Sequence, residues 1–362
     1  MKCTAFTSTF KTSIMGASKK IALFLMGGLT IFAVQAQSNK EAFLVKTFPA
    51  AGIKEVETET SGGNVAVYGQ TSGDARVEMY IHTNNGWGQG LSKDEIQKRL
   101  DEGYDITIAV QGDRLVATAH QKRGWDNNWR HGLSISFMIY APTTVGSHVR
   151  TSGGNIDMKD LTGNENFHTS GGNLDVDHLS GTIVGRTSGG NVTVRNSHND
   201  IDLQTSGGNM EAMYCEGRIQ LGTSGGNVTL RGVKGSIHAS TSGGEVEGDK
   251  ITGDLDAHTS GGNIDLDEVA ATLNASTSGG NIRVHFLSTK SVDLSNSSGD
   301  ISLTLPQGQG MDLRISGERV HSTALNNFKG TFDEHHIDGT LNGGGIPVRV
   351  DGNSGEVHLS FN

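Results

Sequence analysis

The chain has 362 residues, with 52 glycines, only 4 prolines and a formal net charge of −10. Apolar residues make up 34% of the sequence, which excludes a thick globular core. The scarcity of proline beside so much glycine excludes a Pro/Gly-rich disordered chain and indicates many tight turns between short ordered segments. An acidic chain also disfavours nucleic acid and anionic lipid as partners.

Residues 1–36 are typical of a cleaved export signal. Lys19-Lys20 precede an apolar run from Ile21 to Val34, and the residues that follow fit the small-x-small rule for cleavage before Gln37. The run is too short for a membrane span, so we expect no integral span after cleavage. Removing this segment takes away four lysines and no acids, which changes the formal charge from −10 to −14. We therefore expect an exported protein in the periplasm, on the outer cell surface or secreted.

Residues 37–68 are predicted to form leading strands and a first coil, because Thr60–Val65 already matches the repeat that begins at residue 151. Residues 69–150 differ in composition and predict an inserted, hairpin-rich cap over the N-terminal end of the array. Ser92 and Glu95 fit a capping box that opens one short helix, from Leu91 to about Leu100. Three further segments alternate like strands: Tyr104–Val110, Arg114–Ala119 and Leu133–Tyr140.

Two aromatic loops of this cap hold all three tryptophans of the chain. Tryptophan faces beside Asn, Asp and Arg side chains can stack on sugar rings or dock a protein. The candidate ligand-binding residues are therefore Trp87, Trp125, Trp129 and Arg130. The same rings can instead seal the end of the array by burying apolar area, and we favour this packing role.

From residue 151 the sequence repeats every 18 residues. Thr-Ser-Gly-Gly begins at eight evenly spaced positions: Thr151, Thr169, Thr187, Thr205, Thr223, Thr241, Thr259 and Thr277. With Thr as position 1, position 6 is apolar in all eight copies and position 8 in seven. Positions 6 and 8, and often 15 and 17, alternate with polar neighbours, which indicates strands with one buried face.

Two short strands and two turns per repeat predict an all-β fold, a single-stranded parallel β-solenoid with 18-residue coils. Right-handed winding is the default for parallel crossovers. Ile156, Leu174 and Val192 should then point inward, one above another. We expect the Gly-Gly pairs at positions 3 and 4, and the glycine that five copies hold at position 13, to supply positive φ at the two turns. The Asn at position 5 should form an amide ladder. The regular solenoid should span 151–320, with degenerate closing coils over 321–362.

The early Thr60–Asn64 strand, the Leu133–Pro142 segment leading into Thr151–Asn155, and the Ser-Gly-Gly coils after it resemble the bacterial adhesin-like domain family. These are exported proteins with Ser-Gly-Gly β-solenoids, otherwise known as a domain of unknown function. The resemblance covers roughly residues 40–362, the extent of the repeat signals. It implies a β-solenoid and a surface or adhesion role, and it brings no catalytic residues.

Calcium-binding β-rolls are one alternative, because Gly261–Asp267 is similar to their repeat. Such rolls need a carboxylate in every half-turn. Position 7 lacks one in three coils, where the residues are Thr193, Thr229 and Arg283. We therefore expect no calcium, no other metal and no cofactor. The histidines of the coils occupy several different positions of the repeat and form no shared row. This favours surface residues over metal ligands.

A carbohydrate-active β-helix enzyme is the other alternative. Such enzymes cluster Asp, Arg or Lys on one face, whereas the charges here change from coil to coil. Asp265 and Asp267 are interpreted as the solvated side of a strand, and Cys215, at an inward position, as a small core residue. We predict no catalytic residues and no enzyme activity. The expected function is an exported adhesin or cell-envelope binding or structural module, whose partner is an envelope protein or a glycan.

Overall fold

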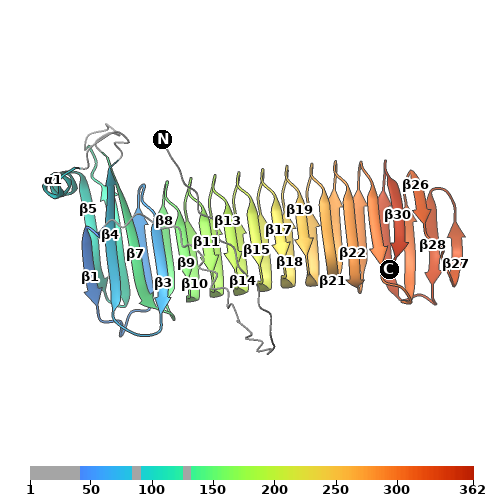
Figure 1. Cartoon of the computed structure of the whole chain (residues 1–362), viewed down its shortest axis with the longest axis horizontal. Helices are drawn as coiled ribbons and strands as arrows, with labels where there is room; N and C mark the ends of the chain where they lie inside the picture. The colour runs from blue at the N-terminus through green and yellow to red at the C-terminus, as the bar shows by residue number, and fades with distance from the viewer. Residues whose placement is uncertain (1–40, 84–90, 125–131) are drawn as a thin grey trace, which may run out of the picture. The chain divides into compact units, whose positions relative to one another are not determined.

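The computed structural model describes residues 41–83, 91–124 and 132–362, and the predicted export signal lies outside these ranges. Within them the chain is all-β, with one helix and strands that pair into two long, mostly parallel ladders. The ladders meet in the long strand β21 (Ile264–Thr277), which pairs on both sides. Figure 1 shows the coils stacked side by side along one axis.

The first ladder carries the strand that follows each Gly-Gly turn. In spatial order its strands are β1 (Leu44–Phe48), β4 (Ala75–Thr83), β7 (Leu133–Pro142), β3 (Val65–Gln70), β9 (Ile156–Lys159), β11 (Leu174–Asp177), β13 (Val192–Arg195), β15 (Met210–Met213), β17 (Val228–Arg231), β19 (Val246–Asp249), β21, β22 (Ile282–Ser288), β24 (Ile301–Leu305), β30 (Glu356–Phe361) and β26 (Arg319–Ser322).

The second ladder carries the other strand of each coil. Its spatial order is β5 (Tyr104–Gln111), β6 (Arg114–Gln121), β2 (Glu55–Thr60), β8 (Gly146–Thr151), β10 (Thr162–His168), β12 (Ser180–Arg186), β14 (His198–Gln204), β16 (Glu216–Gly222), β18 (Lys234–Ser240), β20 (Thr252–His258), β21, β23 (Val292–Asn296), β29 (Ile346–Gly352), β25 (Met311–Ser316), β28 (His336–Leu341) and β27 (Phe328–Phe332).

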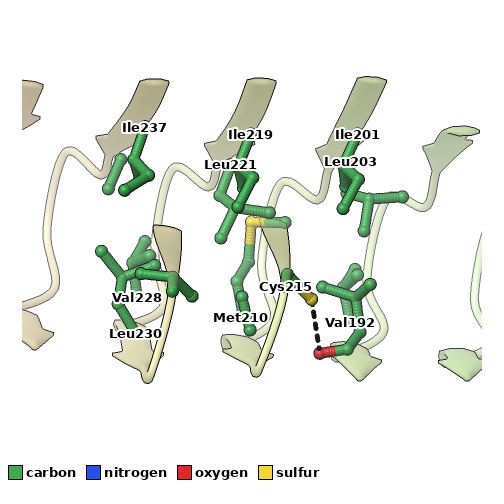
Figure 2. Close-up of a cluster of buried hydrophobic side chains, with 14 of the residues drawn as sticks. Val192, Ile201, Leu203, Met210, Cys215, Ile219, Leu221, Val228, Leu230 and Ile237 are labelled. Carbon is green, nitrogen blue, oxygen red and sulfur yellow. Dashed lines mark hydrogen bonds between the residues drawn. The ribbon is translucent and has the colours of Figure 1, made fainter. Parts of the chain in front are cut away.

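A thin aliphatic core runs between the two ladders. Ile156 pairs with Leu174, and Leu174 with Val192, so equivalent residues of successive repeats face each other in register. All three side chains are buried, as the alternation predicted. Figure 2 shows how the two strands of each coil point their side chains at one another across this core. Cys215 is buried among them, with its Sγ 3.7 Å from the Val194 carbonyl oxygen, which confirms its core role.

The Gly-Gly turns have a different cause from the one predicted. The second glycine of each pair has no positive φ. Instead, a Cβ on Gly208 would lie 2.0 Å from the carbonyl oxygen of Gly190 in the neighbouring coil. The buried Thr205 completes this contact, because its Oγ1 donates to the same oxygen at 2.8 Å. Glycine is needed because the two backbones touch.

The asparagine ladder also differs from the predicted amide-to-amide chain. The backbone N–H of Asn173 donates to Oδ1 of Asn155 at 2.8 Å, and that of Asn191 donates to Oδ1 of Asn173 at 2.9 Å. Each side chain thus satisfies a backbone donor in the next coil that the parallel strands leave unpaired. Positive φ occurs at the opposite corner. It is found at position 10, for example in His178 and Tyr214, both at 54°, and at four of the five position-13 glycines, for example Gly181 at 112°, where it was predicted.

Helix α1 (Lys93–Gly103) begins after Ser92, whose Oγ accepts from the Glu95 N–H at 3.2 Å, as the capping box predicted.

Spatial order departs from chain order at both ends of the stack. At the N-terminal end, β7 lies between β4 and β3. At the other end, β30 lies between β24 and β26, and β29 lies between β23 and β25. The last residues of the chain therefore stack on the coil at 292–305 rather than at the extreme end.

Candidate binding groove

The ligand-binding residues that the sequence suggested, Trp87, Trp125, Trp129 and Arg130, lie outside the described residues. The described residues place a different candidate on the outer face of the first ladder, where β7, β3, β9 and β11 adjoin. Alternate residues of a strand point to opposite faces, so the neighbours of each buried residue line this surface.

Tyrosines supply the aromatic part of the surface. Tyr68 on β3 and Tyr140 on β7 pair in register, with ring centroids 5.8 Å apart and an edge-to-face angle of 66°. The guanidinium carbon of Arg76 on β4 lies 4.2 Å from the Tyr140 ring centroid, which adds a cation–π contact. Tyr80, also on β4, donates its hydroxyl to Glu78 at 2.6 Å. Both rings of the pair are half-buried, which leaves part of each accessible to a ligand.

Charged side chains continue the surface along the next coils. The Tyr68 hydroxyl donates to Oδ2 of Asp157 at 2.8 Å, and Nη2 of Arg195 lies 2.5 Å from Oδ1 of Asp175. Lys159 Nζ and Oδ2 of Asp177 are 3.8 Å apart. Together with the tyrosines, these residues line a groove of about 630 Å³.

Partial burial changes the acidity of the groove residues. Burial raises the pKa of the Asp157 carboxyl, although the Tyr68 hydrogen bond opposes the change. Burial likewise raises the pKa of Asp175, with the Arg195 charge acting in the opposite direction. Burial, followed by the hydrogen bond to Asp157, raises the pKa of Tyr68, so its hydroxyl remains a donor at all physiological pH values. The groove combines aromatic surface with fixed donors and acceptors, as small-molecule sites do.

The groove was not predicted from the sequence, where the only candidate ligand-binding residues were those of the tryptophan loops. The signal was present: Asp157, Asp175 and Arg195 occupy the outward positions 7 and 9 of the repeat, and Tyr68 holds position 9 of the copy that begins at Thr60. Farther along the same face, Arg283 Nη1 lies 2.8 Å from Oδ1 of Asp265, and His285 Nδ1 lies 2.7 Å from Oδ1 of Asp267. These exposed pairs fit the predicted solvated side of a strand.

Comparisons with known proteins give a family match and a structural likeness. The family model described as Toastrack DUF4097 matches residues 136–360. No curated protein matches the chain. Among solved structures, the chain is similar to a "putative cell adhesion protein" from Clostridium sporogenes ATCC 15579, at 11% identity and a TM-score of 0.19. That alignment covers 88% of this chain and 98% of the other, but so low a score supports no conclusion about fold or binding.

Proposed function

Because the chain belongs to the Toastrack DUF4097 family, we propose that it is an exported, non-catalytic adhesin-like module of the cell envelope. Its coils, taken as right-handed and 18 residues long, form a rigid support for binding on their outer faces. The lysine pair and the apolar run within residues 1–36 support export to the periplasm, the cell surface or the medium. In the part of the chain that the structure describes, no helix has the length and apolar character needed to cross a membrane.

The observation that carries this proposal is the groove lined by Tyr68, Tyr140 and Asp157. A sugar ring presents C–H faces that pack on aromatic rings, and hydroxyl groups that donate to carboxylates and accept from cations. The groove offers all three kinds of partner within a few strands. We therefore take an envelope glycan as the ligand. A protein partner is the alternative outcome of the test.

Glycan-array binding of the full chain tests the assignment. Tyr140→Ala and Asp157→Asn are expected to lower the affinity at least about tenfold, because each removes a contact at the centre of the groove. Asp265→Asn is the matched control, since Asp265 occupies the same repeat position six coils away and binding should be unchanged. Full binding by both groove variants would refute the groove. Loss confined to Trp125→Ala and Trp129→Ala would move the site to the tryptophan loops.

One observation favours a second function, a carbohydrate-active enzyme. Asp157 and Asp175 pair in register on neighbouring strands, and burial raises the pKa of both carboxyls. Paired carboxyl groups with separate environments are what glycoside hydrolysis uses. A polysaccharide screen that detects new reducing ends and unsaturated products distinguishes the two functions. Product formation that Asp157→Asn or Asp175→Asn abolishes would establish the enzyme, and a negative screen would remove it.

A further inference from the structure

The outer face of the second ladder carries a cluster of metal-binding side chains on β18 and β20. His238 pairs in register with Asp256, and His258 lies two residues farther along the same strand as Asp256. Residues two apart on a strand share a face, so all three side chains point outward from adjacent rungs. Within the described ranges, no other group places three such ligand atoms within 4.8 Å of one another.

The three ligand atoms lie within 4.8 Å of one another. His238 Nδ1 lies 2.9 Å from Oδ2 of Asp256, and His258 Nε2 lies 2.5 Å from Oδ1 of the same carboxylate. A tetrahedral zinc ion with bonds of about 2.0–2.1 Å separates its ligand atoms by about 3.3 Å. Both printed imidazole–carboxylate distances are shorter than this spacing, so side-chain rotations that lengthen them would be needed to admit an ion.

Two neighbouring side chains on β21 orient the cluster from outside. The Ser276 Oγ lies 2.6 Å from His258 Nδ1, and the Asn274 amide donates to Oδ1 of Asp256 at 2.8 Å. When His258 carries its proton on Nδ1 and donates to Ser276, the lone pair of Nε2 faces the carboxylate. Hydrogen bonds of this kind, from a ligand to a second layer of residues, are typical of protein metal sites.

We propose that His238, Asp256 and His258 bind a divalent transition-metal ion such as zinc. Two imidazoles and one carboxylate suit zinc and its first-row neighbours, and they do not suit magnesium or calcium, which prefer oxygen ligands. The three side chains are 42%, 40% and 35% exposed, so water or a group from a partner completes the coordination. This site lies on the other ladder from the groove, so it stands independently of the proposed function.

The sequence pattern concealed this cluster because the two histidines occupy different repeat positions, 16 and 18. A search for a straight row of histidines misses a diagonal contact between adjacent coils. Such a cluster is found by searching for ligand residues that face the same side of a strand, at positions that are the same or two apart, in neighbouring coils.

Calorimetric titration of the full chain with zinc chloride, prepared without a polyhistidine tag, tests the site. We expect one dominant zinc site in the wild type, an affinity at least tenfold lower in His238→Ala and His258→Ala, and no saturable magnesium binding. His285→Ala is the matched control, because it removes an imidazole–carboxylate pair of similar geometry that lacks the second histidine. Unchanged zinc affinity in folded His258→Ala protein would overturn the proposal.

A second readout separates this site from other histidines of the chain. Cobalt bound by two imidazoles and a carboxylate gives visible d–d absorption, which should be absent in His258→Ala. In Ser276→Ala, titration with cobalt should give an affinity about tenfold lower than in the wild type. His321 and His358, whose rings stack at 5.0 Å beside Glu356, are the competing pair. If His358→Ala removes the cobalt signal and His258→Ala does not, the proposed site is wrong.

Discussion

Replacing Glu165 by glutamine or isoleucine is expected to stabilise the chain above pH 7. Glu165 lies on β10 at the inward position that six of the later coils fill with Ile or Leu, and it is 1% exposed. The Ser147 hydroxyl donates to Oε2, whereas Oε1 has no hydrogen-bond partner. Burial raises the pKa of this carboxyl to about 7, against 4.5 for a solvated glutamate.

The magnitude follows from this difference. The folded chain holds the proton more tightly than the unfolded chain, so the carboxylate destabilises the fold wherever the unfolded group is already ionised. A rise in pKa from 4.5 to about 7 corresponds to about 3 kcal/mol, fully present above pH 7 and absent below about pH 4.5. Wild-type stability should therefore fall as the pH rises through this window.

Urea unfolding followed by circular dichroism at pH 5 and pH 8 measures the effect. The stability difference between Glu165→Gln and wild type should grow by up to about 3 kcal/mol from the lower to the higher pH. Glu247→Gln, which changes an exposed carboxylate on the first ladder, is the control and should follow the wild type. If wild type and Glu165→Gln depend on pH in the same way, the buried carboxyl does not carry the cost assigned to it.

Three further predictions concern the coil turns and core. Gly208→Ala should destabilise the chain by more than about 3 kcal/mol in urea unfolding, because its Cβ would collide with the Gly190 carbonyl. Gly207→Ala is the control: its Cβ would lie 3.7 Å from the nearest atom, so its stability should be nearly unchanged. Thr205→Val should cost about 2 kcal/mol in urea unfolding, since it removes hydrogen bonds to the Gly190 oxygen and from the Gly208 N–H; an unchanged midpoint would contradict that role. Cys215, whose pKa burial raises, should resist iodoacetamide in the native chain and react in urea, as measured by peptide mass spectrometry; rapid native labelling would count against the buried assignment.

The repeat made the interior predictable because side-chain parity follows from strand geometry alone. Ile156, Leu174 and Cys215 are therefore buried as predicted. The reason for the Gly-Gly pairs was predicted wrongly, because a contact between neighbouring coils depends on how closely two backbones approach, and local turn preferences do not contain that distance.

The candidate sites were harder to predict than the core. Tyr68 and Tyr140 are 72 residues apart in sequence and meet only because β7 pairs with β3. His238 and His258 meet on a diagonal between coils. Both contacts require the spatial order of the strands, which the 18-residue period gives for the central coils and does not give for the ends.

The insertion of β29 and β30 between earlier strands has a consequence for biogenesis. The central repeats can assemble coil by coil as they emerge from a ribosome, but the edges of β23 and β24 receive their partners only when residues 346–361 arrive. Until then, two unpaired parallel edges remain available to other chains. A chain terminated before residue 346 would lack both partners, so we expect it to pair with other chains along the edges of β23 and β24 more readily than the full chain does.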